Sequence, residues 1–353
     1  MPLAVSMAPP YVSILISAHY RREFLPAAVD SALSQTADRS SFEVVVVKGF
    51  TDPALDIRLR AQGVQVYDVL QGHVGARVQA MLPRLSGDVV ALLEDDDLFL
   101  PTKVTEVASR FRTDPDLDYY HNGVEPVDRL GAPIPSDDPV LYRLNGLFRP
   151  LRAPFQVDPK TMGPSRFNDL MELGAGFNLS SISVRRRVLA HRPDLLPSVQ
   201  MSLPLFLLFQ VYASGGRILL DPARTTRYRI YPGNNSPDVT GNPIRRWERM
   251  IRGSDARLAD LRLIRSLVQD QAPGLAEPFL ETSLLTYHIF SAMGSKGMHR
   301  AHMARSLVRL LRLNGLRILV NSPAPFAIGG LRLFSDHLSR AASRSIRTLG
   351  AMD

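Results

Sequence analysis

The sequence predicts an α/β protein: a mainly parallel β-sheet with helices on both faces, followed by a mostly helical C-terminal region. Short apolar runs rich in β-branched residues alternate with segments whose apolar residues recur on one helical face, as far as residue 121. This alternation has the spacing of βαβ units, and such units build parallel sheets covered on both faces. From residue 244 the pattern is helical, with breaks at prolines and glycines. We therefore expect two regions, 1–240 and 241–353.

Each element follows from its local pattern. The expected strands are 12–16, 42–47, 64–69, 89–93, 117–121, 180–184, 217–220 and 226–231. The expected helices are 23–34, 55–62, 74–85, 103–111, 185–190 and 203–213, the last ending at a glycine pair. Residues 131–170 are rich in Pro, Asp and Arg and have little periodicity, which predicts a long functional loop or lid.

Composition excludes some kinds of chemistry. The chain has no cysteine, which rules out disulfides, thiol catalysis and cysteine-bound zinc. The net charge of +8 is carried by residues 291–353, which hold ten basic and two acidic residues. A basic patch at one end favours an anionic membrane surface as partner. Nucleic acid is the weaker interpretation, because the tail has few aromatic residues to stack on bases.

The basic tail contains one amphipathic segment. Arg305, Arg309 and Arg312 recur at helical spacing, with leucines on the other side. The alternative is a helix packed on its own domain with its arginines in water. Neither a transmembrane helix nor a signal peptide is recognisable in the sequence. We expect a cytoplasmic protein, and the membrane interpretation of the tail would place it at the cytoplasmic face of the membrane.

Four consecutive acids, Glu94, Asp95, Asp96 and Asp97, follow the apolar run 89–93. Ligands bind beyond the carboxyl ends of strands in open α/β sheets, and hard divalent cations prefer carboxylate oxygens. The acids therefore predict a cation site. The alternative is a solvated turn that caps the helix beginning near Pro101.

Several motifs occur in an order that resembles family 2 glycosyltransferases, which have the GT-A fold. The opening strand and helix of residues 12–34 precede a Phe-Glu-Val-Val-Val-Val strand. The segment 72–77 resembles the family's Gly…Ala-Arg-Asn element, and residues 86–101 resemble its Gly-Asp…Leu-Asp-x-Asp-Asp-x-x-x-Pro motif. Residues 228–231, followed by Asn235 and Ser236, resemble its late Tyr-Arg-x-His…Ser element. The resemblance covers residues 12–236, about two thirds of the chain, and implies a Rossmann-like GT-A domain.

The resemblance also implies a nucleotide-sugar donor and a Mg²⁺ or Mn²⁺ ion, which would stabilise the departing diphosphate as a Lewis acid. Glu94 takes the first Asp position of the motif and Asp96 the second, which makes Asp96 the first choice of metal ligand and Asp97 the second. Asp95 and Asp97 would contact ribose, sugar or metal-bound water.

The nucleotide itself would meet residues from three earlier segments. Arg77 would reach the nucleotide or its diphosphate, because a guanidinium suits phosphate oxygens. Ser17 and His19 lie where the family's first loop holds the nucleobase. A surface arginine and a plain loop histidine are the alternatives for Arg77 and His19.

This sequence departs from the family at the positions that hold the nucleobase and the late histidine. The second strand ends in Lys48, where the family places an Asp that reads the base, so we expect Lys48 among the nucleotide-sugar-binding residues together with Glu94. A lysine cannot, however, accept the base's hydrogen bond. Tyr20 replaces an asparagine and Tyr231 replaces a histidine. The donor base, or the way it is held, therefore differs from the family pattern.

The catalytic base of an inverting transfer is not identified by the sequence. The family places an acid before the apolar helix, but residues 198–204 contain no carboxylate. Asp169, Glu172 and Asp194 are candidates, with a surface salt bridge as the alternative for each. Asn122 is expected to face the acceptor or to cap its loop.

Two functions are therefore open. The first is a metal-dependent glycosyltransferase acting on an unknown acceptor, either a glycan or a lipid phosphate. The second is a catalytically silent GT-A-fold protein that binds nucleotide or glycan, or docks a partner at a membrane surface.

Overall fold

The computed structural model describes residues 9–141, 151–231, 243–269, 273–294, 305 and 308–309. The chain divides into two compact units. The first contains residues 1–234 with 270–272, and the second contains residues 235–269 with 273–353. The first unit is α/β, and the described part of the second is helical.

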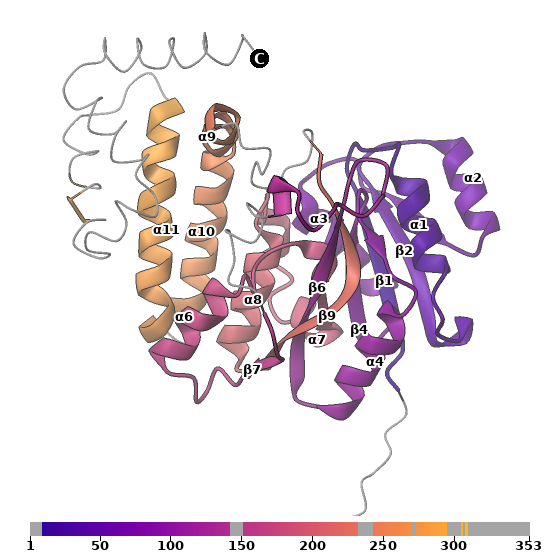
Figure 1. Cartoon of the computed structure of the whole chain (residues 1–353), viewed down its shortest axis with the longest axis horizontal. Coiled ribbons are helices and arrows are strands. Elements are labelled where there is room, and N and C mark those ends of the chain that lie inside the picture. The colour runs from indigo at the N-terminus through magenta and orange to yellow at the C-terminus, as the bar shows by residue number, and fades with distance from the viewer. Residues whose placement is uncertain are drawn as a thin grey trace, which may run out of the picture. The chain divides into compact units, whose positions relative to one another are not determined.

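The first unit is built on one sheet with the strand order β3-β2-β1-β4-β8-β6-β9-β5. Figure 1 labels β1, β2, β4, β6 and β9 of this sheet. One half is parallel: β3 (Gln65–Asp68), β2 (Phe42–Lys48), β1 (Val12–Ala18) and β4 (Val89–Glu94). In the other half, β8 (Ile182–Arg185) runs antiparallel between β4 and β6 (Leu117–Val127). The long β9 (Arg217–Arg229) is parallel to β6, and β5 (Leu98–Phe99) and β7 (Phe155–Val157) pair with it antiparallel.

Helices cover the sheet because the apolar strands are buried on both faces. Alternate residues of the parallel strands, such as Ile14, Val44 and Ala91, form one core with α1 (Leu25–Leu33), α2 (Pro53–Ala61) and α4 (Lys103–Thr113). Their neighbours Leu15 and Val45 are equally buried, and α3 (Val74–Met81) packs against β1 and β2. The remaining described helices of this unit are α6 (Pro164–Glu172), α7 (Arg186–Leu189) and α8 (Leu203–Ser214).

The predicted fold class is confirmed, but three local predictions were wrong. Residues 217–220 and 226–231 were expected as two strands, yet 217–229 is a single strand with irregular register beside Asn122 and Gly123. Strand β6 continues to Val127, beyond the predicted end at 121, because β9 pairs with its second half. The expected lid, 131–170, contains β7 and α6, although residues 142–150 lie outside the described part.

The second unit contains α9 (Pro243–Arg252), α10 (Ser254–Gln269) and α11 (Pro273–Gly294), as the helical pattern predicts. Arg265 of α10 pairs with Glu277 of α11. Arg309 pairs with Glu281, so this residue of the predicted amphipathic segment faces a carboxylate of its own unit. Arg312 and the rest of the basic tail lie outside the described residues. Among the helices that are described, none has the length and apolar character needed to cross a membrane.

Candidate active site

The acids lie at the edge of the sheet where the parallel strands end. In the register of these strands, Ser17 is the partner of Glu94, Ala18 of Lys48, and Lys48 of Asp68. The carboxyl ends of β1, β2, β3 and β4 therefore meet along one edge, which is where open α/β sheets bind ligands. The predicted nucleotide-binding residues and the acids thus share this edge.

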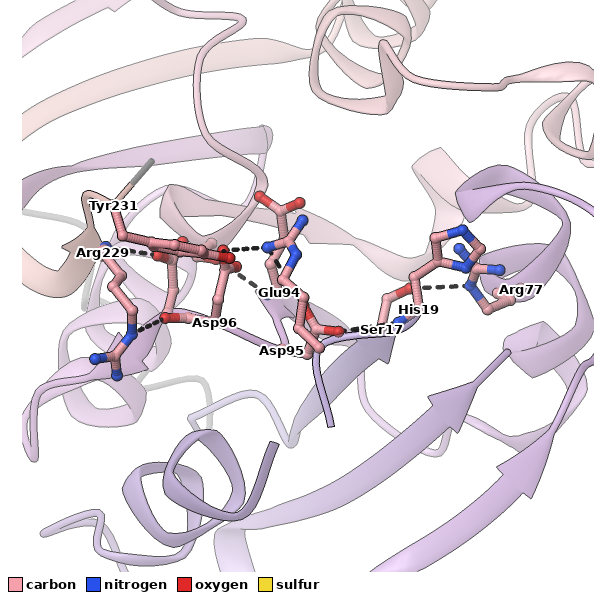
Figure 2. A network of polar contacts seen from close by, with 11 residues as sticks. Ser17, His19, Arg77, Glu94, Asp95, Asp96, Arg229 and Tyr231 are labelled. Carbon is pink, nitrogen blue, oxygen red and sulfur yellow. Dashed lines mark hydrogen bonds and ion pairs between the residues drawn. The ribbon is translucent and has the colours of Figure 1, made fainter. Parts of the chain in front are cut away.

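A cation from the chain itself lies between two of the acids. The guanidinium of Arg21, in the loop after β1, forms ion pairs with Asp96 and, at 3.5 Å, with Asp95 (Figure 2 shows both acids). Asp95 also accepts a hydrogen bond from the backbone N–H of His19 at 3.0 Å. The loop after β1 therefore closes against the acidic turn, and it supplies both a positive charge and a backbone donor. Sequence reasoning assigned no role to Arg21.

The acidic turn is also tied to the end of β9 (Figure 2). The Tyr231 hydroxyl donates to Asp96 Oδ2 at 3.0 Å. The backbone N–H of Arg229 donates to Asp97 Oδ1 at 2.9 Å, and its Nε donates to the carbonyl of Asp96 at 2.7 Å. The late Tyr-Arg-x-Tyr segment, which the sequence identified only through a resemblance, thus orients two of the four acids. Asp97 is turned toward β9 and is only 2% exposed.

Burial of these carboxylates shifts their titration. Burial, with Asp96 nearby, raises the pKa of Glu94 to about 7. Burial raises the pKa of Asp95 to about 6, although the Arg21 guanidinium opposes the shift. Burial alone would lower the pKa of Arg21, but Asp96 and Asp95 outweigh it and raise that pKa. The turn thus holds more negative charge than its surroundings readily accommodate, and a cation stabilises it.

The residues predicted to bind the nucleotide, Ser17, His19 and Arg77, lie together at this edge (Figure 2). The side chain of Arg77, on α3, is nearly buried; its Nε approaches Ser17 Oγ at 3.5 Å and its Nη1 donates to the carbonyl of Gly72 at 3.2 Å. A Cβ on Gly49 would lie 3.2 Å from both Arg77 Nη1 and His19 Nδ1. Burial, then the charge of Arg77, lowers the pKa of His19. A neutral imidazole and a guanidinium therefore stand side by side at the strand ends.

Lys48 points away from this surface. Its side chain is fully buried, and its Nζ contacts Asp56 Oδ1 at 3.0 Å, the carbonyl of Phe50 at 2.9 Å, and Asp68 Oδ1. The contacts to Phe50 and Asp68 are hydrogen bonds donated by the ammonium, and the contact to Asp56 is an ion pair. The structure places Lys48 beneath the nucleotide surface, where it holds the ends of β2 and β3 together.

A buried polar network lies behind the acids. The amide of Asn122 accepts from Lys103 Nζ and donates to the carbonyl of Gly123 at 2.6 Å and to Thr226 Oγ1 at 3.0 Å. Burial lowers the pKa of Lys103 to about 7. Asn122 is fully buried and its amide is used by the sheet, so the structure gives it a supporting position in place of the expected contact with an acceptor.

The three base candidates are dispersed. Asp194 is exposed and forms an ion pair with Arg192 at 2.9 Å. Asp169 and Glu172 lie on α6, which packs through Phe167 against the aromatic side chains of α8. The start of α8, where the family places its acid, carries Ser202 and Leu203. The structure thus brings together the predicted donor-site residues but does not gather the base candidates at the acids.

The donor set fits a divalent cation on chemical grounds. Asp95 and Asp96 already hold one cation, Arg21, between them, and their oxygens are the hard ligands that Mg²⁺ and Mn²⁺ prefer. Within the described residues, no group of three or more acidic or histidine side chains is arranged so that it could by itself hold a metal ion. Mg²⁺ is commonly bound by one or two carboxylates together with substrate phosphates, so a small protein donor set suffices.

Comparison with known proteins finds sequence matches in the part of the chain that carries the acids and the ends of the parallel strands. Residues 13–163 match the model of glycosyl transferase family 2. An uncharacterised glycosyltransferase of Nostoc sp. is 32% identical over 109 residues, a segment that spans 29% of this chain and 33% of that protein. The chain therefore covers only about a third of that relative's length.

Solved structures of S. aureus TarS, residues 1–349, show the same fold. The crystal structure of that protein matches 95% of this chain and 88% of its own, with a TM-score of 0.53 and 16% identity. Its complex with UDP-GlcNAc matches 96% and 91%, with a TM-score of 0.54 and 15% identity. The fold is that of GT-A glycosyltransferases. Residues 13–163, less than half of the chain, are thus similar to glycosyl transferase family 2.

Proposed function

We propose that the protein transfers a sugar from a nucleotide-sugar donor to an acceptor, with inversion at the anomeric carbon. The observation that carries the proposal is the edge where Arg77, Ser17 and His19 line the ends of β1 and β2 beside the acids of β4. That edge lies within the part of the chain that matches the family.

Each part of the edge has a distinct task in such a transfer. The diphosphate would lie between Arg77 and the acidic turn, because a guanidinium binds phosphate oxygens with two donors. A divalent cation held by Asp96, the oxygen of which faces Arg21 and Tyr231, would neutralise the developing charge on the diphosphate. Asp97 and Arg229 would keep the turn in place, and Glu94 and Asp95 would face ribose or sugar.

The positive charge of Arg21 has two uses in this proposal. Without donor it neutralises Asp95 and Asp96, which would otherwise repel each other. With donor bound, the same guanidinium lies within reach of the departing diphosphate. A charge that is already in place stabilises a leaving group without a further conformational change.

A second function is favoured by one specific observation. The start of α8 carries no carboxylate, and the candidate acids Asp169, Glu172 and Asp194 belong to other elements. A GT-A-fold protein that binds a nucleotide-sugar or a glycan without transferring it would need no base. Donor binding followed by a turnover assay separates these functions.

The first experiment is calorimetric titration of the full chain with UDP and GDP in Mn²⁺, using the wild type and Asp96→Ala. We expect Asp96→Ala to weaken nucleotide binding in Mn²⁺ by about tenfold or more and to leave binding in EDTA unchanged. Asp88→Ala is the matched control, since it removes an exposed carboxylate just before the other end of β4. Equal effects of the two variants would contradict the proposed site.

The second experiment measures turnover. Hydrolysis of UDP-GlcNAc and GDP-mannose by the wild type, but not by Asp96→Ala, would support the transferase. Binding without release of nucleoside diphosphate, in the presence of a glycan or a lipid-phosphate acceptor, would favour the silent binding protein.

The acceptor and the membrane remain further parts of the proposal. We propose a glycan or lipid-phosphate acceptor, with the basic tail on an anionic membrane surface of the cytoplasm. What supports it is the charge of residues 291–353. Co-sedimentation of the full chain with vesicles of anionic and of neutral phospholipids tests it, and equal binding to both would contradict it.

A further inference from the structure

The carboxyl ends of β2 and β3 form a corner of the sheet edge to which the proposed transfer assigns no residue. Neighbouring strands lie about 4.8 Å apart, so the end of β3 is roughly 14 Å along the edge from the end of β4. A nucleoside diphosphate whose phosphates lie near Asp96 and Arg77 would extend its base toward the ends of β2 and β3. The role of that corner rests on the proposed donor site.

Lys48 cannot recognise a base in this corner, although it occupies the last position of β2. Its ammonium is buried and is held by Asp56, Asp68 and the carbonyl of Phe50. Removing either partner would leave a buried charge without compensation, so the lysine is fixed where it lies. Its side chain therefore partly neutralises the two carboxylates of Asp56 and Asp68.

Lys48 holds the side chain of Asp68 in place through an ion pair. Asp68 ends β3 beside Lys48 in the register, and its Oδ1 accepts from the lysine ammonium. Its side chain is 29% exposed. Within the described residues, Oδ2 of Asp68 has no hydrogen bond or ion pair. One oxygen is thus fixed by a buried cation, and the other, on a side chain that is partly exposed, keeps its capacity to accept a hydrogen bond.

The chain that follows Asp68 connects this oxygen to the nucleotide surface. The backbone N–H of Val69 donates to the carbonyl of Lys48 at 2.9 Å, which keeps the exit of β3 against that of β2. Three residues later, the carbonyl of Gly72 accepts from Arg77. Gly49, just after β2, lies close to both Arg77 and His19. The corner is therefore made by the adjacent ends of β2 and β3, with Asp68 at the end of β3 and with Gly49, after β2, close to His19.

We propose that Asp68 reads the nucleobase of the donor and that Lys48 is the positioning residue that aims it. The acceptor oxygen selects a ring N–H that lies beside a carbonyl, as at N3 of uracil or N1 of guanine. Cytosine and adenine carry an unprotonated ring nitrogen at the equivalent place, and its lone pair repels a carboxylate. A buried lysine and an exposed aspartate on adjacent strands thus replace the single aspartate that the family places at the end of β2.

The test compares four nucleotides on the full chain in Mn²⁺ by calorimetric titration: UDP, GDP, CDP and ADP. The wild type should bind UDP or GDP about tenfold or more tightly than CDP and ADP. Asp68→Asn keeps an oxygen for Lys48 and adds an amide donor. It should lose about tenfold in affinity for the preferred nucleotide and none for CDP.

Asp56→Asn is the matched control, because Asp56 pairs with the same ammonium from α2 and its side chain is 9% exposed. If Asp68 acts only by holding Lys48, the two variants should have the same effect on binding. Circular dichroism checks that both fold. A measurement on the wild type alone needs no variant: UDP methylated at N3 should bind about tenfold more weakly than UDP if uracil is the base.

Each outcome of these titrations either supports or overturns the assignment of Asp68. Selective loss in Asp68→Asn, with Asp56→Asn unchanged, supports the assignment, and the preferred nucleotide identifies the base. Equal losses in both variants, a loss that is the same for all four nucleotides, or a wild type that binds all four equally overturns it while the proposed donor site stands. A wild type that binds none of the four overturns the proposed function and this assignment with it.

Discussion

Raising the pH from 4 to 7 is expected to destabilise the first unit through Asp95. Burial raises the pKa of Asp95 from its ordinary 3.8 to about 6 in the folded protein. Above pH 4 the unfolded chain has ionised this carboxyl, whereas the folded chain still binds its proton until about pH 6. The folded state therefore binds more protons, and the free energy of unfolding falls as the pH rises through this window. This increase in the pKa of Asp95, from 3.8 to about 6, corresponds to a loss of about 3 kcal/mol in the free energy of unfolding.

Asp95→Asn isolates this contribution, because the amide does not titrate and its oxygen can still accept from the backbone of His19. Urea denaturation followed by far-UV circular dichroism, in EDTA at pH 4, 5, 6 and 7, gives the free energies of unfolding. The value for Asp95→Asn minus that for the wild type should rise by about 3 kcal/mol across the series. Asp88→Asn serves as control, since its carboxyl is exposed. A difference for Asp95→Asn that is flat, or that falls with pH, would refute the reasoning.

Three further changes test the packing and charge of the site. Arg21→Gln removes the resident cation from Asp96, so Mn²⁺ affinity measured by electron paramagnetic resonance should rise about tenfold, and an unchanged affinity would count against a shared cation site. Tyr231→Phe removes one hydrogen bond to Asp96 and should lower the free energy of unfolding by about 1 kcal/mol in urea denaturation; no loss would argue against that bond. Gly75→Ala places a Cβ 1.9 Å from the carbonyl oxygen of Leu196 and should lower the free energy of unfolding by about 1–3 kcal/mol. The control is Gly163→Ala, which has nothing within 4 Å of its Cβ and should lower it by less. Equal shifts of the melting temperature in the two variants would contradict the close approach at Gly75.

The sequence predicted the parallel half of the sheet well because each strand there is marked locally. Apolar runs such as 42–47 and 89–93 are buried on both faces, so nearly every position is apolar and the run stands out. The mixed half was predicted less well. Residues 217–229 contain Asp221, Pro222 and Arg224 in the middle of one strand, and only pairing with β6 makes that strand continuous.

In the candidate site, too, residues that belong to local motifs were predicted and residues placed by tertiary contacts were not. The acids, Arg77 and Ser17 belong to motifs that can be read in order, and the parallel register brings them to one edge. Arg21 and the orientation of Asp97 could not be predicted, since they depend on which loop closes over the turn. The signal for Tyr231 and Arg229 was present in the late motif, but the sequence does not say which acid each one meets.

The sequence by itself predicted the strands of the parallel half, the position of the acids at a strand end and the resemblance to family 2 glycosyltransferases, because these depend on local apolar pattern and on residue order. The tertiary structure alone decided which charges meet. Lys48 is buried under Asp68, Asn122 is used inside the sheet, and Arg21 lies between Asp95 and Asp96. Such pairings join residues that are far apart in the chain, and their energies depend on burial and distance, which a linear pattern does not contain.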